Sequence, residues 1–223
     1  MIAAKVDLEF FWDPICPFAW QTSNWVRRVA TLRNLNVEWR LMSLAILNRD
    51  QVSGTDKIEE HRKGQRMLRV AASVRAAEGQ LSLAIFYEVL GHSIWDITNK
   101  ESVDYQLYLG TEKHLIFVLE HAGFDLKHAA AADQEFWDAE LQVETEEAIS
   151  RSGPGVGTPI LTFFPPNGPS IFGPVISEVP ESDEDCLVLY DSVLSLASNS
   201  SFFELKRTNR LRPDLPALKR SLT

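Results

Sequence analysis

The stretch "FFWDPICPFAW", residues 10–20, decides the fold because it sets a cysteine between an apolar run and a proline. Apolar residues alternate with charged ones just before it, which predicts a strand over residues 5–12. A helix is expected over residues 16–33, since Pro17 suits a first helical turn, where no backbone donor is needed. Cys16 should therefore lie at the N-terminus of a helix and at the carboxyl end of a strand.

The rest of the chain changes from strand to helix patterns and back. A second strand is expected in "NVEWRLMSLAIL", ending near Asn48. From about residue 55 to residue 151, apolar residues recur at spacings of three and four, which predicts roughly four or five helices. Strand character returns in "PILTFFPP" and its hairpin partner "IFGPV". A closing helix follows in "ESDEDCLVLYDSVLSLAS", where Ser182 and Asp185 resemble a capping box.

This order of elements gives the fold class as α/β with a large all-helical insertion. We expect residues 1–54 and 152–205 to form one α/β domain. Residues 55–151 form the helical insertion in this division, and residues 206–223 form a basic C-terminal tail.

Charge is distributed unevenly along the chain. The net charge is −9, but the segment from Leu205 on has six basic residues and one acidic residue, so it carries +5 and the rest −14. An acidic body repels nucleic acid backbones, so no nucleic-acid partner is expected. We expect the basic tail to be a solvated, poorly ordered terminus rather than a docking arm.

Several classes of protein are disfavoured by what the sequence lacks. No apolar run approaches the ~20 residues that span a bilayer, and the N-terminal "MIAAKVDLEF" has no signal-peptide pattern. A cytoplasmic protein without a membrane partner is therefore expected. Two cysteines, Cys16 and Cys186, do not make a disulfide framework, and the five histidines show no zinc-binding spacing, so no metal site is expected.

Cys16 is the candidate catalytic residue. A helix N-terminus presents free N–H groups and a partial positive charge, which lower a cysteine pKa from ~8.5 into the range ~3.5–7.5. Asp13 would oppose this shift if its side chain points inward. The alternative is that Cys16 is a small buried core residue. The following proline and the neighbouring aromatic residues favour a functional thiol.

The second motif is "GVGTPIL", residues 155–161, in which a Thr-Pro pair leads directly into a strand. A cis peptide bond can occur at Pro159, although only ~5–6% of such bonds are cis. The backbone of Thr158 would then be free to pair with an extended ligand. We therefore count Gly157, Thr158 and Pro159 as candidate substrate-binding residues.

These motifs together resemble the DsbA-like branch of the thioredoxin superfamily. The sequence is most similar to the actinobacterial mycothiol-dependent reductases, also called nitroreductases. "FFWDPICPFAW", "MSLAILN", "VGTP", "FGPVISEVP" and "FFELKRT" carry this resemblance, and they span residues 10–208. It implies a thioredoxin-like fold with a helical lid, an active Cys16, a cis Pro159 and a low-molecular-weight thiol as co-substrate, such as mycothiol. No permanently bound cofactor is expected.

The sequence departs from this family at the usual Cys-Pro-Trp-Cys box. Phe18 stands where the family has tryptophan, and Ala19 stands where it has the second cysteine. A dithiol enzyme resolves its mixed disulfide with its own second thiol, which Ala19 cannot do. Cys186 is a poor substitute because acidic neighbours disfavour its thiolate. The hypothesis is therefore monothiol chemistry, in which a small thiol releases the product.

Five further residues are candidates for binding a small or aromatic electrophilic or disulfide substrate. Asn48 could hold a polar group, or be a strand-ending turn residue. His61 could act as a base above the cleft, or be a solvent-exposed helix residue. Trp12 and Phe18, with Pro17 beside them, could form an apolar floor, although core packing is the usual fate of such aromatic residues.

Two other functions remain open. The kappa-class glutathione transferases and the 2-hydroxychromene-2-carboxylate isomerases share this plan and need no redox-active pair. A catalytically silent relative that binds a partner is the third alternative. The sequence also leaves a homodimer open.

Overall fold

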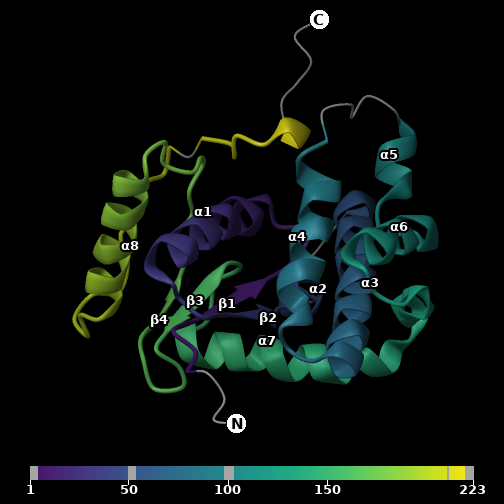
Figure 1. Cartoon of the computed structure of the whole chain (residues 1–223), viewed down its shortest axis with the longest axis horizontal. Coiled ribbons are helices and arrows are strands. Elements are labelled where there is room, and N and C mark those ends of the chain that lie inside the picture. Colours follow the sequence, from purple (N-terminus) through teal and green to yellow (C-terminus); the bar gives the residue numbers. More distant parts are fainter. Residues whose placement is uncertain (1–4, 50–53, 98–102, 210, 219–223) are drawn as a thin grey trace, which may run out of the picture.

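The computed structural model describes residues 5–49, 54–97, 103–209 and 211–218 (Figure 1). Its centre is a four-stranded sheet in the order β2-β1-β3-β4. The strands are β1 (Leu8–Trp12), β2 (Val37–Leu41), β3 (Ile160–Phe163) and β4 (Ser170–Phe172). β1 pairs parallel with β2 and antiparallel with β3, and β3 forms an antiparallel hairpin with β4. The expected α/β class is confirmed.

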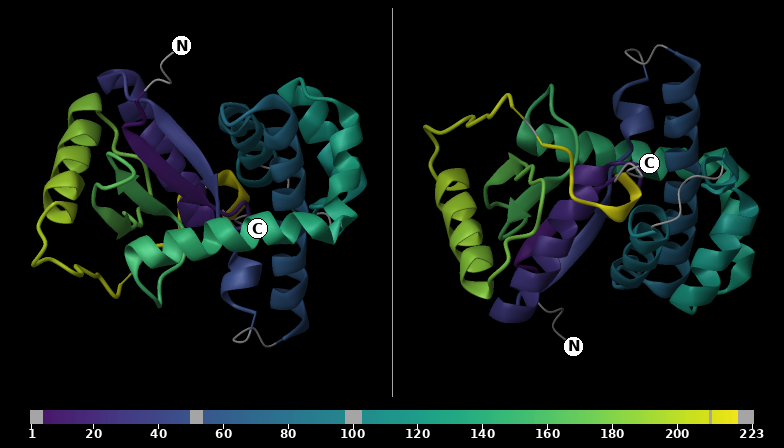
Figure 2. Two further views of the ribbon diagram at one scale, coloured as in Figure 1. Left: turned by 90° about the horizontal axis from the view of Figure 1, so that it is seen from below. Right: turned by 90° about the horizontal axis from the view of Figure 1, so that it is seen from above.

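Helices cover both faces of the sheet and form a separate layer beside it. They are α1 (Pro17–Arg33), α2 (Leu44–Leu47), α3 (Thr55–Glu78), α4 (Ser82–Trp95), α5 (Val103–Tyr108), α6 (Glu112–Ala122), α7 (Asp138–Ser152) and α8 (Asp183–Ala197), with 3-10 turns at Leu126–Asp133, Glu135–Trp137 and Pro216–Leu218. The views of Figure 2 place α1 on one face of the sheet and α7 on the other, with α8 beside α1. The described part of the chain contains no helix of the length and hydropathy that a membrane span requires.

Local signals in the sequence explain where several helices begin. Cys16 is the N-cap of α1 and Pro17 its first residue, as the motif predicts. The Ser182 hydroxyl accepts a hydrogen bond from the Asp185 amide at 3.0 Å, so the predicted cap of α8 is confirmed.

The expected second strand is shorter than the sequence suggests. β2 ends at Leu41, and Asn48 lies at the C-terminal end of the short helix α2 instead of ending a strand. The physical reason is a cap: the Ser43 hydroxyl accepts a hydrogen bond from the Ile46 amide at 3.2 Å and starts a helical turn. The alternating apolar residues around Ser43 favour a strand, so the sequence pattern does not indicate this helical turn.

The C-terminal tail is expected to be solvated and poorly ordered, and this expectation is wrong for residues 213–218. Leu215 and Ala217 are buried in the main hydrophobic core, and the 3-10 turn Pro216–Leu218 contacts α4. The Asp214 amide donates to the Ser177 carbonyl at 2.6 Å. Apolar burial of these side chains outweighs the entropy of ordering the segment. We call residues 213–218 the C-terminal strap (Figure 2).

The helical layer shares one core with the sheet. Trp12 at the end of β1 stacks on Tyr87 of α4, with ring centroids 3.9 Å apart. Trp20 of α1 meets the same tyrosine edge-on at 5.6 Å. The buried Arg27 guanidinium lies 4.2 Å from the Trp39 ring centroid, an arrangement that partly offsets the cost of burying its charge.

Ion pairs fasten α7 to the other face of the sheet. Arg40 of β2 donates to Glu9 of β1 at 2.7 Å, to Glu144 of α7 at 2.9 Å and to Glu147 of α7 at 2.6 Å. α7 also contacts α3, so it belongs to both layers. The division of the chain near residues 54 and 152 stays a prediction.

The contact between α1 and α4 requires a glycine. A Cβ atom at Gly91 would lie 2.1 Å from the Trp20 ring. No real Cβ contact is that short, so the absence of a side chain at Gly91 lets α4 approach α1 closely.

We expect Gly91→Ala to lower the free energy of unfolding by about 1–3 kcal/mol, because overpacking displaces the Trp20 ring. In an unconstrained helix the same change would be stabilising by about 1 kcal/mol, so the sign of the effect is diagnostic. Denaturant unfolding measures it, with Glu88→Ala on the exposed side of α4 as the control. A stabilised Gly91→Ala variant would contradict this packing.

Candidate active site

The Cys16 sulfur lies between the first turn of α1 and the loop before β3. Its Sγ atom accepts a hydrogen bond from the Ala19 amide at 3.4 Å and donates one to the Thr158 carbonyl at 3.4 Å. Cys16 and Thr158 are 142 residues apart in the sequence, but the β1–β3 pairing sets Phe11 opposite Ile160 and brings both segments together. Cys16 as a whole residue is half-buried.

The Thr158–Pro159 peptide bond is cis. Both residues are buried, and Gly157 before them is half-buried at the opening of the site. The Thr158 hydroxyl is buried without a hydrogen-bond partner in the described part of the chain. This loop therefore offers a carbonyl and an unsatisfied hydroxyl beside the thiol.

The loop before Cys16 is held by three elements of the helical layer. The Asp13 carboxylate accepts hydrogen bonds from the Leu44 amide at 2.7 Å and the Ile15 amide at 3.0 Å. The Trp95 indole of α4 donates to the Pro14 carbonyl at 3.1 Å. Gly64 of α3 packs so tightly that an added Cβ would lie 3.1 Å from the Ile15 side chain. From the sequence, Asp13 is expected only as an opposing charge. Its role in tying α2 to this loop has no local sequence signal, because Leu44 is 31 residues away.

Burial raises the pKa of the Cys16 thiol, although the Thr158 side chain and the Ala19 amide act in the opposite direction. The expected depression of this pKa is therefore wrong. The helix terminus stabilises the thiolate, but the apolar surroundings of the sulfur cost more.

Asp13 is a second cause of the raised pKa of the Cys16 thiol. Burial raises the pKa of Asp13 to about 7, against the opposing hydrogen bonds from Ile15 and Leu44. When its carboxylate ionises, its negative charge raises the Cys16 pKa further. The resting form near neutral pH is a thiol that donates to Thr158.

The other predicted site residues fall into two groups. Pro17 and Phe18 are half-buried in the first turn of α1, next to the sulfur in sequence. Trp12 does not line a substrate floor, because its side chain is fully buried against Tyr87. Phe10 and Trp12 belong to the main core, whereas Phe11 belongs to a second buried cluster that includes Ala148 of α7.

Asn48 and His61 lie on the helices that follow β2. The Asn48 amide donates to the Leu44 carbonyl of its own helix at 3.0 Å, so it is engaged locally. His61 is half-buried on α3, one turn before Gly64, which contacts the Cys16 loop. Burial lowers the pKa of His61, so its imidazole is neutral at pH 7.

Cys186 is far from this site. Its side chain is fully buried in α8, and its Sγ donates to the Pro180 carbonyl at 3.5 Å. Its carbonyl accepts a hydrogen bond from Trp25, which lies nine residues after Cys16 on α1, or about 13 Å along the helix axis. Among the described residues, no group of three or more histidine, cysteine or acidic side chains is arranged to hold a metal ion.

Comparisons with solved structures agree with this fold. The cytosolic disulfide reductase DsbM from Pseudomonas aeruginosa superposes with a TM-score of 0.53 at 14% identity, covering 85% of this chain and 99% of that one. A 2-hydroxychromene-2-carboxylate isomerase superposes with a TM-score of 0.54 at 16% identity, covering 84% and 94%. At these identities the likeness shows the fold alone.

A cysteine that opens a helix and faces the residue before a cis-proline is the arrangement of thiol-disulfide oxidoreductase-like enzymes with a DsbA-like thioredoxin fold. This chain is such an enzyme. The model of the Rv2466c-like family, described as mycothiol-dependent nitroreductase Rv2466c, matches residues 15–207, and the chain belongs to this family. A curated relative, the uncharacterized protein Rv2286c of Mycobacterium tuberculosis (strain ATCC 25618 / H37Rv), is 28% identical over 207 residues, which cover 90% of this chain and 81% of the relative.

The raised pKa predicts how alkylation of Cys16 by iodoacetamide depends on pH. Only the thiolate reacts, so the rate constant should increase about tenfold per pH unit from about pH 7 and still be increasing at about pH 9. Peptide mass spectrometry at each pH separates Cys16 from Cys186, and Cys16→Ser serves as the blank. A plateau below pH 7 would show that the helix terminus dominates and that the burial argument is wrong.

Proposed function

We propose that this protein is a monothiol oxidoreductase in which Cys16 alone forms and releases a mixed disulfide. The observation that carries the proposal is the isolation of the Cys16 sulfur. It is half-buried beside Thr158, Ala19 occupies the helical position of a resolving thiol, and Cys186 is buried in α8. The co-substrate is a low-molecular-weight thiol, in line with the family description as mycothiol-dependent.

The reaction at Cys16 takes two exchange steps. In the first, the Cys16 thiolate attacks one sulfur of a disulfide, a new S–S bond forms, and the other sulfur leaves as a thiolate that takes up a proton. In the second, the thiolate of the small thiol attacks the mixed disulfide at the substrate sulfur, and Cys16 is released as a thiolate. One half of the substrate disulfide leaves as a thiol, and the other half leaves as a mixed disulfide with the small thiol. A second molecule of the small thiol attacks that mixed disulfide, which releases the second substrate thiol and leaves the small thiol as its own disulfide.

The first turn of α1 and the loop before β3 supply the binding groups. Pro17 and Phe18 present an apolar surface next to the sulfur. Gly157, Thr158 and Pro159 form the opposite wall, where the Thr158 carbonyl and unsatisfied hydroxyl can pair with a polar group of the ligand. A substrate that displaces the Thr158 carbonyl from the thiol leaves Cys16 facing the α1 amides, which favours the thiolate.

His61 precedes Gly64 by three residues on α3, and Gly64 packs against the Cys16 loop. As a neutral imidazole it can accept the proton of an incoming thiol, and we assign it this role. We assign Asn48 a smaller role in substrate binding, because its side-chain amide donates to the Leu44 carbonyl of α2. We further propose a cytoplasmic location, where small thiols are kept reduced, and we keep a homodimer as an assembly to be measured.

Treatment with an oxidised small thiol should add one thiol mass to Cys16 and none to Cys186. The probe is oxidised glutathione or mycothiol disulfide, and the measurement is intact and peptide mass spectrometry. Cys16→Ser should abolish both the adduct and disulfide reductase turnover, while Cys186→Ser should change neither. Retained turnover in Cys16→Ser would instead favour transferase or isomerase chemistry, in which the bound thiol itself reacts.

Ala19→Cys should convert the protein into a dithiol enzyme. The introduced thiol attacks the Cys16 sulfur of the mixed disulfide from within the same helical turn. The bound thiol then leaves without an external thiol, and an intramolecular disulfide between Cys16 and the introduced thiol remains. The intramolecular step should accelerate release at least ~100-fold. Stopped-flow release and mass spectrometry of the product measure this, with Ala19→Ser as the control. An adduct equally persistent in Ala19→Cys would contradict the proposed geometry.

A further inference from the structure

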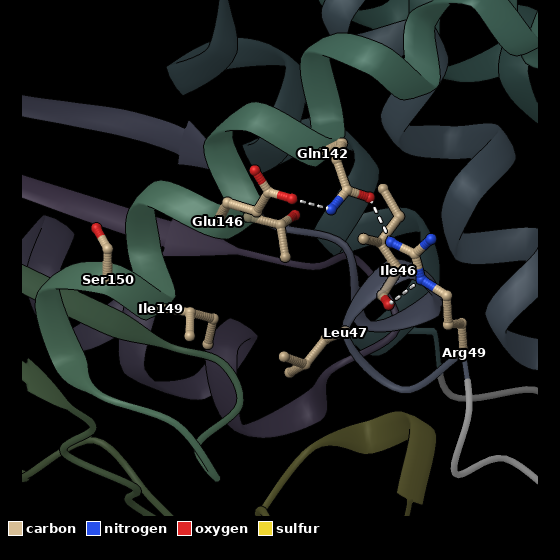
Figure 3. Close-up of a pocket in the computed structure, with 8 residues that line it drawn as sticks. Ile46, Leu47, Arg49, Gln142, Glu146, Ile149 and Ser150 are labelled. Atoms are coloured by element: carbon tan, nitrogen blue, oxygen red, sulfur yellow. Dashed lines mark hydrogen bonds between the residues drawn. The ribbon is translucent and has the colours of Figure 1, made fainter.

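A groove lies between α2 and α7. Its volume is about 340 Å³, and Figure 3 shows its lining side chains, which include Ile46, Leu47 and Ile149 as apolar walls. Arg49, Gln142 and Glu146 stand along one rim. The proposed exchange chemistry uses none of these residues.

The groove wall is continuous with the loop that faces Cys16. Leu47 and Ile149 pack, together with Val156, on a buried cluster beneath the groove. Val156 lies two residues before Thr158, whose carbonyl accepts the Cys16 thiol. Gly157 also lies close to α2, since a Cβ atom at Gly157 would be 3.8 Å from the Leu44 side chain. Leu44 is less than one helical turn before Leu47 on α2. A ligand attached to the Cys16 sulfur can therefore extend along this wall.

Among the described residues, no carboxylate neutralises the cation on this rim. The Arg49 guanidinium donates to the Ile46 carbonyl at 3.3 Å and to the Gln142 side-chain oxygen, both of which are uncharged acceptors. No ion pair joins Arg49 to another residue in the described ranges. The remaining N–H donors of its planar fork are suited to holding a carboxylate in two parallel hydrogen bonds.

Glu146 is the opposing charge on this rim. Its carboxylate accepts a hydrogen bond from the Gln142 amide nitrogen, so Gln142 bridges Glu146 and Arg49 (Figure 3). The bridge orients the Gln142 oxygen toward Arg49, where it occupies the place that a ligand carboxylate would take. Glu146 lies on the other side of that amide and lowers affinity for an anion by repulsion.

We propose that this groove is a subsite for the part of the substrate beyond the sulfur, and that it takes an aromatic or branched apolar group bearing a carboxylate. The inference rests on the proposed monothiol function and adds a substrate class to it. The apolar walls bind the hydrocarbon part, and Arg49 binds the carboxylate after the Gln142 side chain turns aside. Arg49 is a specificity residue, since it does not touch the reacting sulfur atoms.

Two aromatic disulfides of different charge test this subsite. 5,5′-Dithiobis(2-nitrobenzoate) carries a carboxylate on each ring, and 4,4′-dithiodipyridine is uncharged at neutral pH. The measurement is the second-order rate constant for release of the aromatic leaving group by the full chain, followed by its absorbance, with mass spectrometry to assign the adduct to Cys16. We expect Arg49→Gln to slow the carboxylate reagent at least ~10-fold, which corresponds to the lower end of the range for one hydrogen bond to a charged group. The uncharged reagent should change less than about twofold, because it has no group for Arg49 to bind.

Two further variants separate local from long-range charge effects. Glu146→Gln should accelerate the carboxylate reagent, because it removes the opposing charge from the rim. Arg33→Gln makes the same charge change as Arg49→Gln at the far end of α1, where Arg33 pairs with Asp191, and it should alter neither reagent. An equal effect of Arg33→Gln, or an equal loss of both reagents in Arg49→Gln, would overturn the subsite. If the native chain reacts with neither reagent at Cys16, the monothiol function fails, and the subsite fails with it.

Discussion

The pairing of β1 with β3 is the constraint on which the site depends. It sets Phe11 opposite Ile160 and so brings the residues that follow β1 next to those that precede β3. The Cys16 thiol and the Thr158 carbonyl meet only because of this register. A shift by one residue would turn every side chain of β3 to the opposite face and remove Thr158 from the sulfur. The chemistry of the site is thus set by the sheet, although its reactive atom lies on a helix.

The helical layer fixes the second half of the geometry. Asp13 ties the Cys16 loop to α2, Trp95 ties it to α4, and Gly64 brings α3 against Ile15. These contacts bury the sulfur and the carboxylate near it, and burial is why both have raised pKa values. Rigid placement and low thiol acidity therefore have one common cause. A ligand that changes the polarity around Cys16 can change the pKa of the thiol without changing the position of the sulfur.

Local signals in the sequence predict much of this structure. Cys16 followed by Pro17 predicts the start of α1, and Ser182 predicts the start of α8, because caps act over a few residues. Ser43 carried the same signal for α2, but the alternating apolar pattern around it favoured a strand. The pKa of Cys16 could not be predicted locally, since it depends on burial by α2, α3, α4 and a loop 142 residues away. The groove also needed the tertiary structure, because Arg49 and Gln142 are 93 residues apart.

The chain connects the sheet and the helical layer in more than one place. It enters the layer after β2, returns along α7, and reaches α4 again through the C-terminal strap, whose Leu215 and Ala217 lie in the common core. Residues 199–209, between α8 and the strap, are mostly exposed, so this stretch behaves as a tether between two anchored ends. Any hinge motion that separated α4 from the α1–α8 side would have to straighten the tether or pull both apolar anchors into water. The C-terminal strap therefore limits the amplitude of this hinge motion, although it lies far from Cys16 in the sequence.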